Sequence, residues 1–372
     1  MKKLLSIALI CAFCALCAQA VDVVKPQPPK TNRVDVVFVL DTTGSMTGLI
    51  EGAKRKIWSI ANAIVDQNPN ALIRVGLIGY RDLGDEYVAR YYPLTTDIQD
   101  IYAKLLLFTA SGGGDTPESV NEALDIAITK MEWTDARTRA NRIVFLVGDA
   151  PPHMDYDQDR KYPEIIAEAK QRGIIVNAVQ AGDMDSTKKA WKEIARLGGG
   201  NYIAIPQDGG RVIVIDTPYD EEIIIIQRKL NSTVVPYGAS TQQKEVKGKL
   251  QSYETAPAPA AADMSGFINK SSRGKEVITG EGDLVGDVAN NLKKIGDIPT
   301  KELPKDMQSM SVKEREAYIA KQIEERNTLS RQLAEIVTKR DEFIKTAETK
   351  QDKKVDSFDQ AISRILEKQV KE

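Results

Sequence analysis

Hydrophobic positions between residues 33 and 206 fall into two alternating patterns. Near-continuous apolar runs, rich in β-branched residues, occupy Val34 to Leu40, Ile73 to Ile78, Ile143 to Val147 and Ile174 to Val179. Such runs are typical of strands that are buried on both faces of a parallel sheet. The segments between them carry apolar residues at spacings of three and four, the pattern of an amphipathic helix. The alternation predicts an α/β fold, with a doubly wound, mostly parallel sheet covered by helices on both faces.

Further segments complete this first domain. "ARYYPLT", residues 89–95, is expected to be an edge strand, because Pro93 is tolerated best at a sheet edge. "NYIAIP", residues 201–206, is expected to be the last strand, and "RVIVID" after it to fold back as a hairpin. A helix over Asp220 to Leu230 closes the domain, which we place at residues 33–231.

The pattern changes in the C-terminal part of the chain. "TAPAPAAAD" predicts an extended, semi-rigid linker, and residues 232–310 as a whole an irregular segment with one short helix over Leu284 to Ile295. Residues 311–372 contain neither glycine nor proline, and their apolar spacing predicts a long helix or a helical hairpin. Two interpretations stay open because Arg340 interrupts the heptad: a coiled coil that pairs with another chain, or a solvated helix packed on its own domain.

The first twenty residues have the composition of a secretory signal peptide. Lys2 and Lys3 precede an apolar run, and Ala18-Gln19-Ala20 matches a small-x-small cleavage site. We therefore expect cleavage after Ala20 and a periplasmic or secreted product without a membrane span, with an uncleaved anchor as the alternative. All three cysteines lie in this segment, so the remaining chain offers neither disulfides nor thiolate ligands.

The length of the chain limits the number of domains, and its net charge limits the kind of partner. The 372 residues suffice for one large domain and an appendage. The formal net charge is −2 at pH 7, and this mild acidity argues against nucleic acid as the partner.

Oxygen-bearing side chains gather where two of the predicted strands end. Asp41 ends the first strand, and Asp149 ends the strand expected beside it, across the point where the strand order reverses. Thr43 and Ser45 follow in the loop after the first strand, and Thr116 lies at the mouth of a helix behind three consecutive glycines. These five residues offer oxygen and neither sulfur nor imidazole. Such a set selects a hard cation, Mg²⁺ first, with Mn²⁺ or Ca²⁺ as alternatives.

Structural explanations exist for the same residues. Asp41 and Ser45 would also serve to close a strand and cap the next helix. His153 is the only histidine, and we expect it to hydrogen-bond to a neighbour rather than act as a general base. Arg81 and Asp82 are expected to form an ion pair that shapes a loop.

Three loops of this sequence resemble one known family. "DTTGS" resembles the D-x-S-x-S motif of the metal-ion-dependent adhesion site in von Willebrand factor type A domains. "GGGDTPES" and "LVGDAPPH" resemble the second and third metal-binding loops of that family, in the same order. The likeness covers residues 33–206 and is greater to bacterial and kinase-associated members than to integrins. The five residues above match the three loops in turn, and Thr43 stands where serine is usual, which keeps the hydroxyl oxygen.

The resemblance implies a protein-binding module, which the predicted signal peptide would export. Its bound divalent cation would accept a carboxylate from an acidic side chain of a partner protein. One alternative is a structural or assembly role with self-association through residues 311–372. The other is a metal-dependent phosphohydrolase, but Thr43 stands where an aspartate acid/base would be needed and the sequence has no phosphate-binding G-x-x-x-x-G-K loop. We therefore expect no enzymatic activity.

Overall fold

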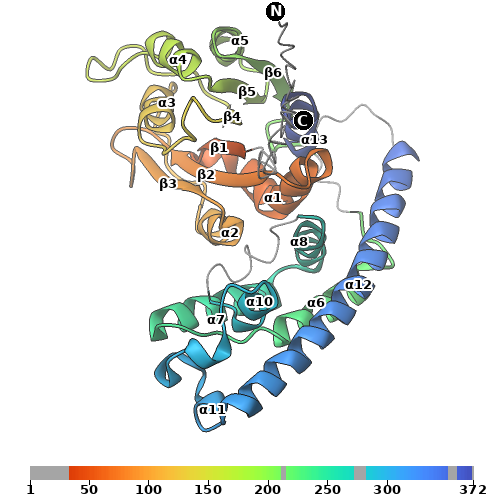
Figure 1. Cartoon of the computed structure of the whole chain (residues 1–372). Helices are drawn as coiled ribbons and strands as arrows, with labels where there is room; N and C mark the ends of the chain where they lie inside the picture. The colour runs from red at the N-terminus through yellow and green to blue at the C-terminus, as the bar shows by residue number, and fades with distance from the viewer. Residues whose placement is uncertain (1–32, 211–214, 272–281, 351–357, 371–372) are drawn as a thin grey trace, which may run out of the picture. The chain divides into compact units, whose positions relative to one another are not determined.

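The computed structural model describes residues 33–210, 215–271, 282–350 and 358–370 (Figure 1). The predicted signal peptide, the three cysteines and most of the predicted "RVIVID" hairpin lie outside these residues. None of the described helices combines the length and the apolar composition that a membrane span requires.

Six strands form a single sheet in the order β3-β2-β1-β4-β5-β6. Their bounds are β1 Arg33–Asp41, β2 Leu72–Tyr80, β3 Ala89–Thr95, β4 Ala140–Gly148, β5 Ile175–Ala181 and β6 Gly199–Ile205. Every neighbouring pair is parallel except β2 and β3. The predicted α/β fold is confirmed, as is the edge strand at residues 89–95. The strand order reverses between β1 and β4, which therefore flank the topological switch point.

Helices cover both faces of the sheet because its strands are apolar on both sides. They are α1 Thr47–Gln67, α2 Ile98–Leu106, α3 Val120–Thr129, α4 Tyr162–Gln171 and α5 Asp185–Leu197, with a short 3-10 helix η1 Gly44–Met46 before α1. Successive side chains of a strand point to opposite faces. Accordingly, Phe38 and Leu40 of β1 pack in the core with α1 and α2, whereas Val37 and Val39 pack in the core with α3, α4 and α5.

A helix from the end of the chain completes one face of this sheet. Helix α13, Phe358–Gln369, lies beside α1 (Figure 1), and its Ile362 and Leu366 belong to the same core cluster as α1. The backbone N–H of Phe358 donates to Gly209 at 2.9 Å, and the side-chain amide of Gln369 donates to Asn177 of β5 at 2.9 Å. Residues distant in sequence are thus part of the core of the sheet domain.

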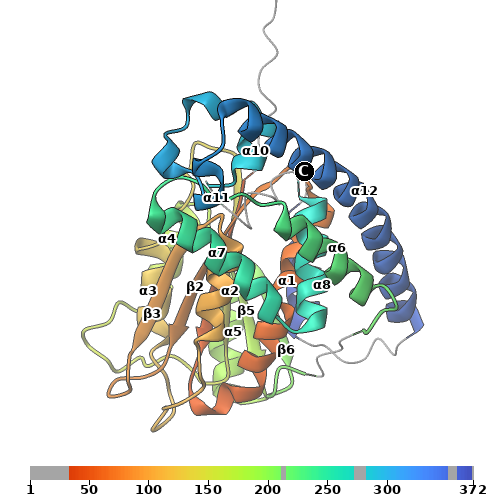
Figure 2. The ribbon, with the colours of Figure 1, turned by 90° about the horizontal axis from the view of Figure 1, so that it is seen from below.

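Helices also dominate the segment between the sheet and α13. They are α6 Asp220–Ser232, α7 Ser240–Thr255, α8 Ala258–Lys270, α10 Leu284–Ala289, η2 Ile295–Asp297, η3 Thr300–Glu302, α11 Lys305–Gln308 and α12 Val312–Lys350. Helix α12 packs against α6, α8 and α10 (Figure 2). The predicted helix over Asp220 to Leu230 is α6, and the helix predicted over Leu284 to Ile295 is the shorter α10.

The extended linker predicted from "TAPAPAAAD" is wrong, because helix α8 begins inside it. Proline is favourable in the first helical turn, where its missing N–H has no partner to lose, so Pro259 does not prevent the helix. The alanines that follow are strong helix formers. Ala261 and Phe267 of α8 are buried in the same core cluster as α1, so the alanine run allows close packing.

The long helix predicted from residue 311 onward is confirmed, and it packs on its own chain. Its apolar residues Leu329, Leu333 and Ile336 are buried in one cluster with α6. Arg340 interrupts the heptad. Its Nε lies 2.6 Å from Oδ1 of Asp220, and its Nη2 lies 2.8 Å from Oδ1 of Asp263. The irregular position thus serves an intramolecular ion pair, while self-association through this region stays a prediction.

Candidate metal centre

Asp41 is buried at the carboxyl end of β1, with no exposed surface. Both the backbone N–H and the hydroxyl of Thr43 donate to its Oδ1, at 2.9 and 2.6 Å. This local side-chain turn fixes the carboxylate. The other oxygen, Oδ2, has no hydrogen-bond partner in the described part of the chain. A buried carboxylate oxygen without a partner is costly, so Asp41 is oriented for an additional ligand.

The next two predicted ligands continue from Asp41. The hydroxyl oxygens of Thr43 and Ser45 lie 3.2 Å apart, so Asp41, Thr43 and Ser45 form one connected series of oxygens. Ser45 is exposed in η1, whereas Thr43 is buried. This series therefore extends from the sheet edge to the protein surface.

Asp149 follows β4 and is half-buried beside Asp41. Burial, and next the charge of Asp149, raise the pKa of Asp41 to about 7. The close approach depends on Gly148, where an added Cβ would lie 2.3 Å from the Tyr80 hydroxyl and 3.2 Å from Asp41 Oδ2. The side-chain amide of Gln207 donates to Asp149 at 2.5 Å. The structure thus brings both carboxylates together at the switch point.

Thr116 lies in the glycine-rich loop that packs on the Thr43 loop. The backbone N–H of Gly44 donates to Gly112 at 3.1 Å, and Gly112 and Gly113 adopt φ values of 79° and 78°, a conformation that favours glycine. Thr116 itself is exposed. No hydrogen bond joins its hydroxyl to the other four residues among those described. Its ligand role stays a prediction.

Glu118 is a member of this site that the sequence analysis missed. Its side chain lies just before α3 and is buried, and its Oε2 has no hydrogen-bond partner among the described residues. Burial, and then the charges of Asp41 and Asp82, raise its pKa to about 9. A glutamate at the start of a helix ordinarily faces solvent, where it stabilises the helix dipole, so the sequence carried no signal of its burial.

Of the hydrogen bonds and ion pairs predicted near this site, the one of His153 is confirmed and the one of Arg81 is not. His153 makes the expected local hydrogen bond, with Nδ1 2.8 Å from an oxygen of Asp155. The expected ion pair of Arg81 with Asp82 is wrong. Arg81 instead pairs with Glu86 at 3.4 Å and donates to the carbonyl oxygen of Thr109 at 2.7 Å, because its guanidinium is directed toward the loop after α2.

The donor set fits a hard divalent cation. It combines two carboxylates with hydroxyl oxygens, which Mg²⁺, Mn²⁺ and Ca²⁺ prefer. The unpartnered Oδ2 of Asp41 and the neighbouring negative charge of Asp149 are the features that a bound cation would satisfy. Asp41, Thr43, Ser45 and Asp149 would hold such an ion, which would supply an electrophilic position for an incoming oxygen.

Solved structures similar to this chain include three proteins. The SpRpn10 VWA domain is 13% identical, with 48% of this chain and 89% of that chain covered and a TM-score of 0.36. An aerotolerance-related membrane protein of Bacteroides fragilis is 20% identical, with 47% and 92% covered and a TM-score of 0.32. Proximal thread matrix protein 1 from the mussel byssus is 16% identical, with 48% and 43% covered and a TM-score of 0.35.

Sequence comparison gives the family of the sheet domain. The chain is 32% identical over 124 residues to an ariadne-like RING finger protein of Acanthamoeba polyphaga mimivirus, a match that covers 32% of this chain and 11% of that protein. The alpha-protein kinase vwkA of Dictyostelium discoideum is 32% identical over 124 residues, and the match covers 32% of this chain and 19% of the kinase. The chain therefore matches only a minor part of either relative. The model of the von Willebrand factor A domain matches residues 35–216, and this chain therefore contains a von Willebrand factor A domain.

Proposed function

We propose that this chain is an exported, metal-dependent protein-binding module. A Mg²⁺-type cation, with Mn²⁺ or Ca²⁺ as alternatives, is held by the five residues of the three loops and accepts a carboxylate from a partner protein. The set is Asp41, Thr43, Ser45, Thr116 and Asp149. The observation that carries the proposal is the buried, unpartnered Oδ2 of Asp41 beside a second carboxylate.

An open coordination position follows from the exposure of the five residues. Asp41 and Thr43 are buried beneath the loop, whereas Ser45 and Thr116 are exposed. A cation bound between them would have protein on one side and solvent on the other. Because five or fewer protein oxygens leave at least one position of an octahedral shell free, an oxygen of a partner carboxylate can complete the shell from the solvent side.

Binding accounts for this site better than catalysis does. Domains of this family are generally protein-interaction modules, and the hydroxyl that pairs with a carboxylate among the five residues, that of Thr43 with Asp41, is buried. The assembly alternative finds less support, because Leu329, Leu333 and Ile336 of α12 are covered by α6 within the same chain. Export rests on residues 1–20, whose charged start, apolar run and small-x-small site favour a signal peptide.

Calorimetric titration with Mg²⁺, Mn²⁺ and Ca²⁺ tests the metal site directly. We expect one site in the wild-type chain, and loss of binding in Asp41→Asn. Because Asp41 is buried, Ser45→Ala provides a second variant at an exposed position and should weaken binding without affecting the fold. Asp135→Asn is the matched control, since Asp135 is an exposed carboxylate in the loop before β4, at the opposite sheet edge. Equal binding by wild type and both site variants would remove the proposal.

The partner is tested by binding to immobilised peptides that differ only in one acidic position. We expect retention of Asp- or Glu-containing peptides with cation present, and none with a chelator or in the Asp41→Asn chain. Peptides in which the acidic residue is replaced by its amide serve as controls. Retention that is the same with and without cation would contradict a carboxylate-to-metal contact.

A further inference from the structure

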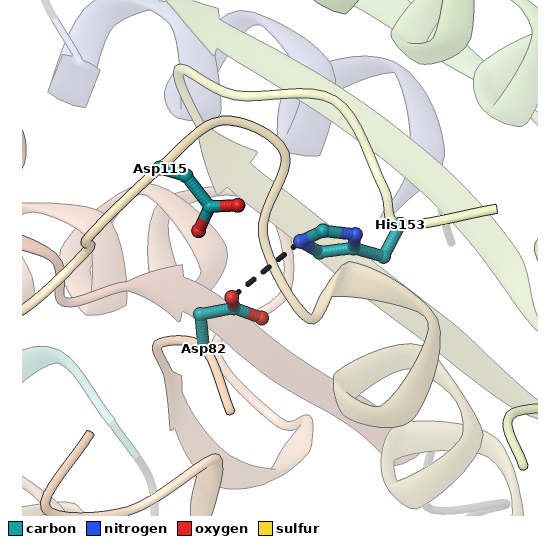
Figure 3. A group of neighbouring side chains, drawn as sticks. All are labelled: Asp82, Asp115 and His153. Atoms are coloured by element: carbon teal, nitrogen blue, oxygen red, sulfur yellow. Dashed lines mark ion pairs between the residues drawn. The ribbon is translucent and has the colours of Figure 1, made fainter. Parts of the chain in front are cut away.

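A second group of metal-ligating side chains lies beside this site, on three different loops. Asp82 follows β2, Asp115 belongs to the glycine-rich loop, and His153 follows β4 (Figure 3). One candidate ligand atom from each residue lies within 4.8 Å of the other two. This Asp82–Asp115–His153 group shares no residue with the five of the proposed function, and it includes the only histidine of the chain.

The orientation of the His153 ring is fixed by its surroundings. The ring is buried, with 4% of the residue exposed, and it stacks on Tyr156 with ring centroids 3.8 Å apart. The backbone N–H of His153 donates to the carbonyl oxygen of Glu118 at 3.0 Å. Nδ1 lies 2.8 Å from Asp155, so Nδ1 donates its proton to that carboxylate, and in the neutral ring the lone pair is on Nε2.

Nε2 of His153 is buried and has no hydrogen-bond partner among the described residues. It lies 3.4 Å from Oδ2 of Asp82 without hydrogen-bond geometry. A lone pair held this close to a carboxylate oxygen is unfavourable, so the gap takes either a second ring proton or a bound metal ion. The carboxylate-histidine-metal arrangement of zinc sites has the same parts, with a carboxylate on one ring nitrogen and the metal on the other.

Asp82 is equally well fixed. The hydroxyl of Ser119 donates to its Oδ1 at 2.8 Å, and the hydroxyl of Tyr156 donates to its Oδ2 at 2.9 Å. The Tyr156 hydroxyl also lies 3.2 Å from Oδ1, whereas Oδ2 accepts from no other described residue and retains a free lone pair. No lysine or arginine pairs with Asp82 in the described part of the chain, because Arg81 is directed toward Glu86. Asp82 therefore presents a buried negative charge and a free lone pair to Nε2.

We propose that Asp82, Asp115 and His153 bind a zinc ion. Two ligand atoms at 2.0–2.1 Å from a tetrahedral zinc lie about 3.3 Å apart, which agrees with the 3.4 Å between Nε2 of His153 and Oδ2 of Asp82. Imidazole with two carboxylates suits zinc better than magnesium. Asp115 is exposed, so its loop gives the ion a path from solvent, and water occupies the fourth position.

Zinc titration against a chromophoric chelator tests this assignment. All chains carry Cys11→Ser, Cys14→Ser and Cys17→Ser, because thiolates there would compete for zinc, and Asp41→Asn to silence the neighbouring oxygen site. We expect one zinc per chain. Affinity should fall at least about tenfold in Asp115→Asn and in His153→Gln. Asp157→Asn, which removes an exposed carboxylate from the same loop as His153, should leave affinity unchanged.

X-ray absorption of the zinc-loaded chain provides an independent measurement. Because the chain has one histidine, imidazole scattering in the zinc shell can come only from His153, and His153→Gln should abolish it. Asp115→Asn should not disturb folding, since the Asp115 side chain is exposed, and it therefore tests zinc binding separately from stability. A zinc shell of oxygens alone, or affinity unchanged in both ligand variants, would overturn the assignment without affecting the magnesium-type site.

Discussion

The carboxyl group of Asp41 at the end of β1 and that of Asp149 after β4 lie next to one another across the strand-order reversal. Thr43 satisfies one oxygen of Asp41 and nothing described satisfies the other. Burial and the second charge together raise the pKa of Asp41 to about 7. This relationship connects metal binding to the pH dependence of stability.

Thermal stability of the metal-free chain should therefore fall as pH rises from about 4 to about 7. Asp41 has an ordinary value of 3.8 and a folded value of about 7, so in this range the folded state keeps a proton that the unfolded state has lost. Stability contributed by that proton is fully present below about pH 3.8 and is lost as pH rises through about 7. Calorimetry at fixed ionic strength measures it. Asp41→Asn should make the curve less steep in this range, with the remaining slope due to Glu118, and an unchanged slope would contradict this origin.

Magnesium should restore the stability lost at high pH. Only the folded state brings the ligands together, so binding stabilises it by about 2.7 kcal/mol when the free ion is at one hundred times its dissociation constant. Melting temperature at pH 8 should rise with Mg²⁺ in the wild type, and it should rise less at the same ion concentration in Ser45→Ala. Asp135→Asn, remote from the site, should respond as wild type. A rise of equal size in Ser45→Ala would mean that the ion acts elsewhere.

Glu118→Gln should raise the melting temperature of the metal-free chain at pH 8 and leave it unchanged at pH 4. Burial raises the pKa of Glu118 from 4.5 to about 9, so between these values folding requires the carboxyl group to take up a proton. Glutamine keeps the shape without that requirement. Glu164→Gln, at an exposed position of α4, is the control and should change neither value. A lower melting temperature for Glu118→Gln at pH 8 would show that the charged form is stabilising.

The sequence predicts the strands of this domain more fully than its helical surroundings. Apolar runs and the switch-point rule suffice to place Asp41 and Asp149 at one edge of the sheet, because strand register and parallel direction leave few alternatives. Glu118 escapes the same reasoning, since its burial depends on loops that meet only in the folded chain. The start of helix α8 was not predicted, because a segment rich in proline and alanine is compatible both with an extended linker and with the first turns of a close-packed helix.

Helix α13 shows where local pattern gives too little information. Its apolar spacing predicts a helix with one buried face, but the spacing does not say that the covering surface is the sheet domain.

Because α13 is part of the core of the sheet domain, Ile362→Ala should destabilise the whole domain by about 2–5 kcal/mol, the usual cost of such a truncation in a core. Urea unfolding followed by tryptophan fluorescence measures it, because Trp58 of α1 and Trp191 of α5 lie in the cores on the two faces. Ile225→Ala, at a side chain 44% exposed, should cost far less, and equal costs would place α13 outside the core.

Arg340 of α12 provides the strongest test of how the C-terminal helices are held. It pairs with Asp220 of α6 and Asp263 of α8, and burial raises the pKa of Asp263 despite the attraction of Arg340. Arg340→Ala leaves two largely buried carboxyl groups without their cation, so we expect a loss of about 3–5 kcal/mol in free energy of unfolding. Combining it with Asp220→Asn and Asp263→Asn should recover much of that loss, since the uncompensated charges are then gone. Lys339→Ala, the exposed neighbour on the same helix, should stay within about 0.5 kcal/mol of wild type. If the triple variant were no more stable than Arg340→Ala, lost packing of the arginine stem rather than buried charge would be the cause.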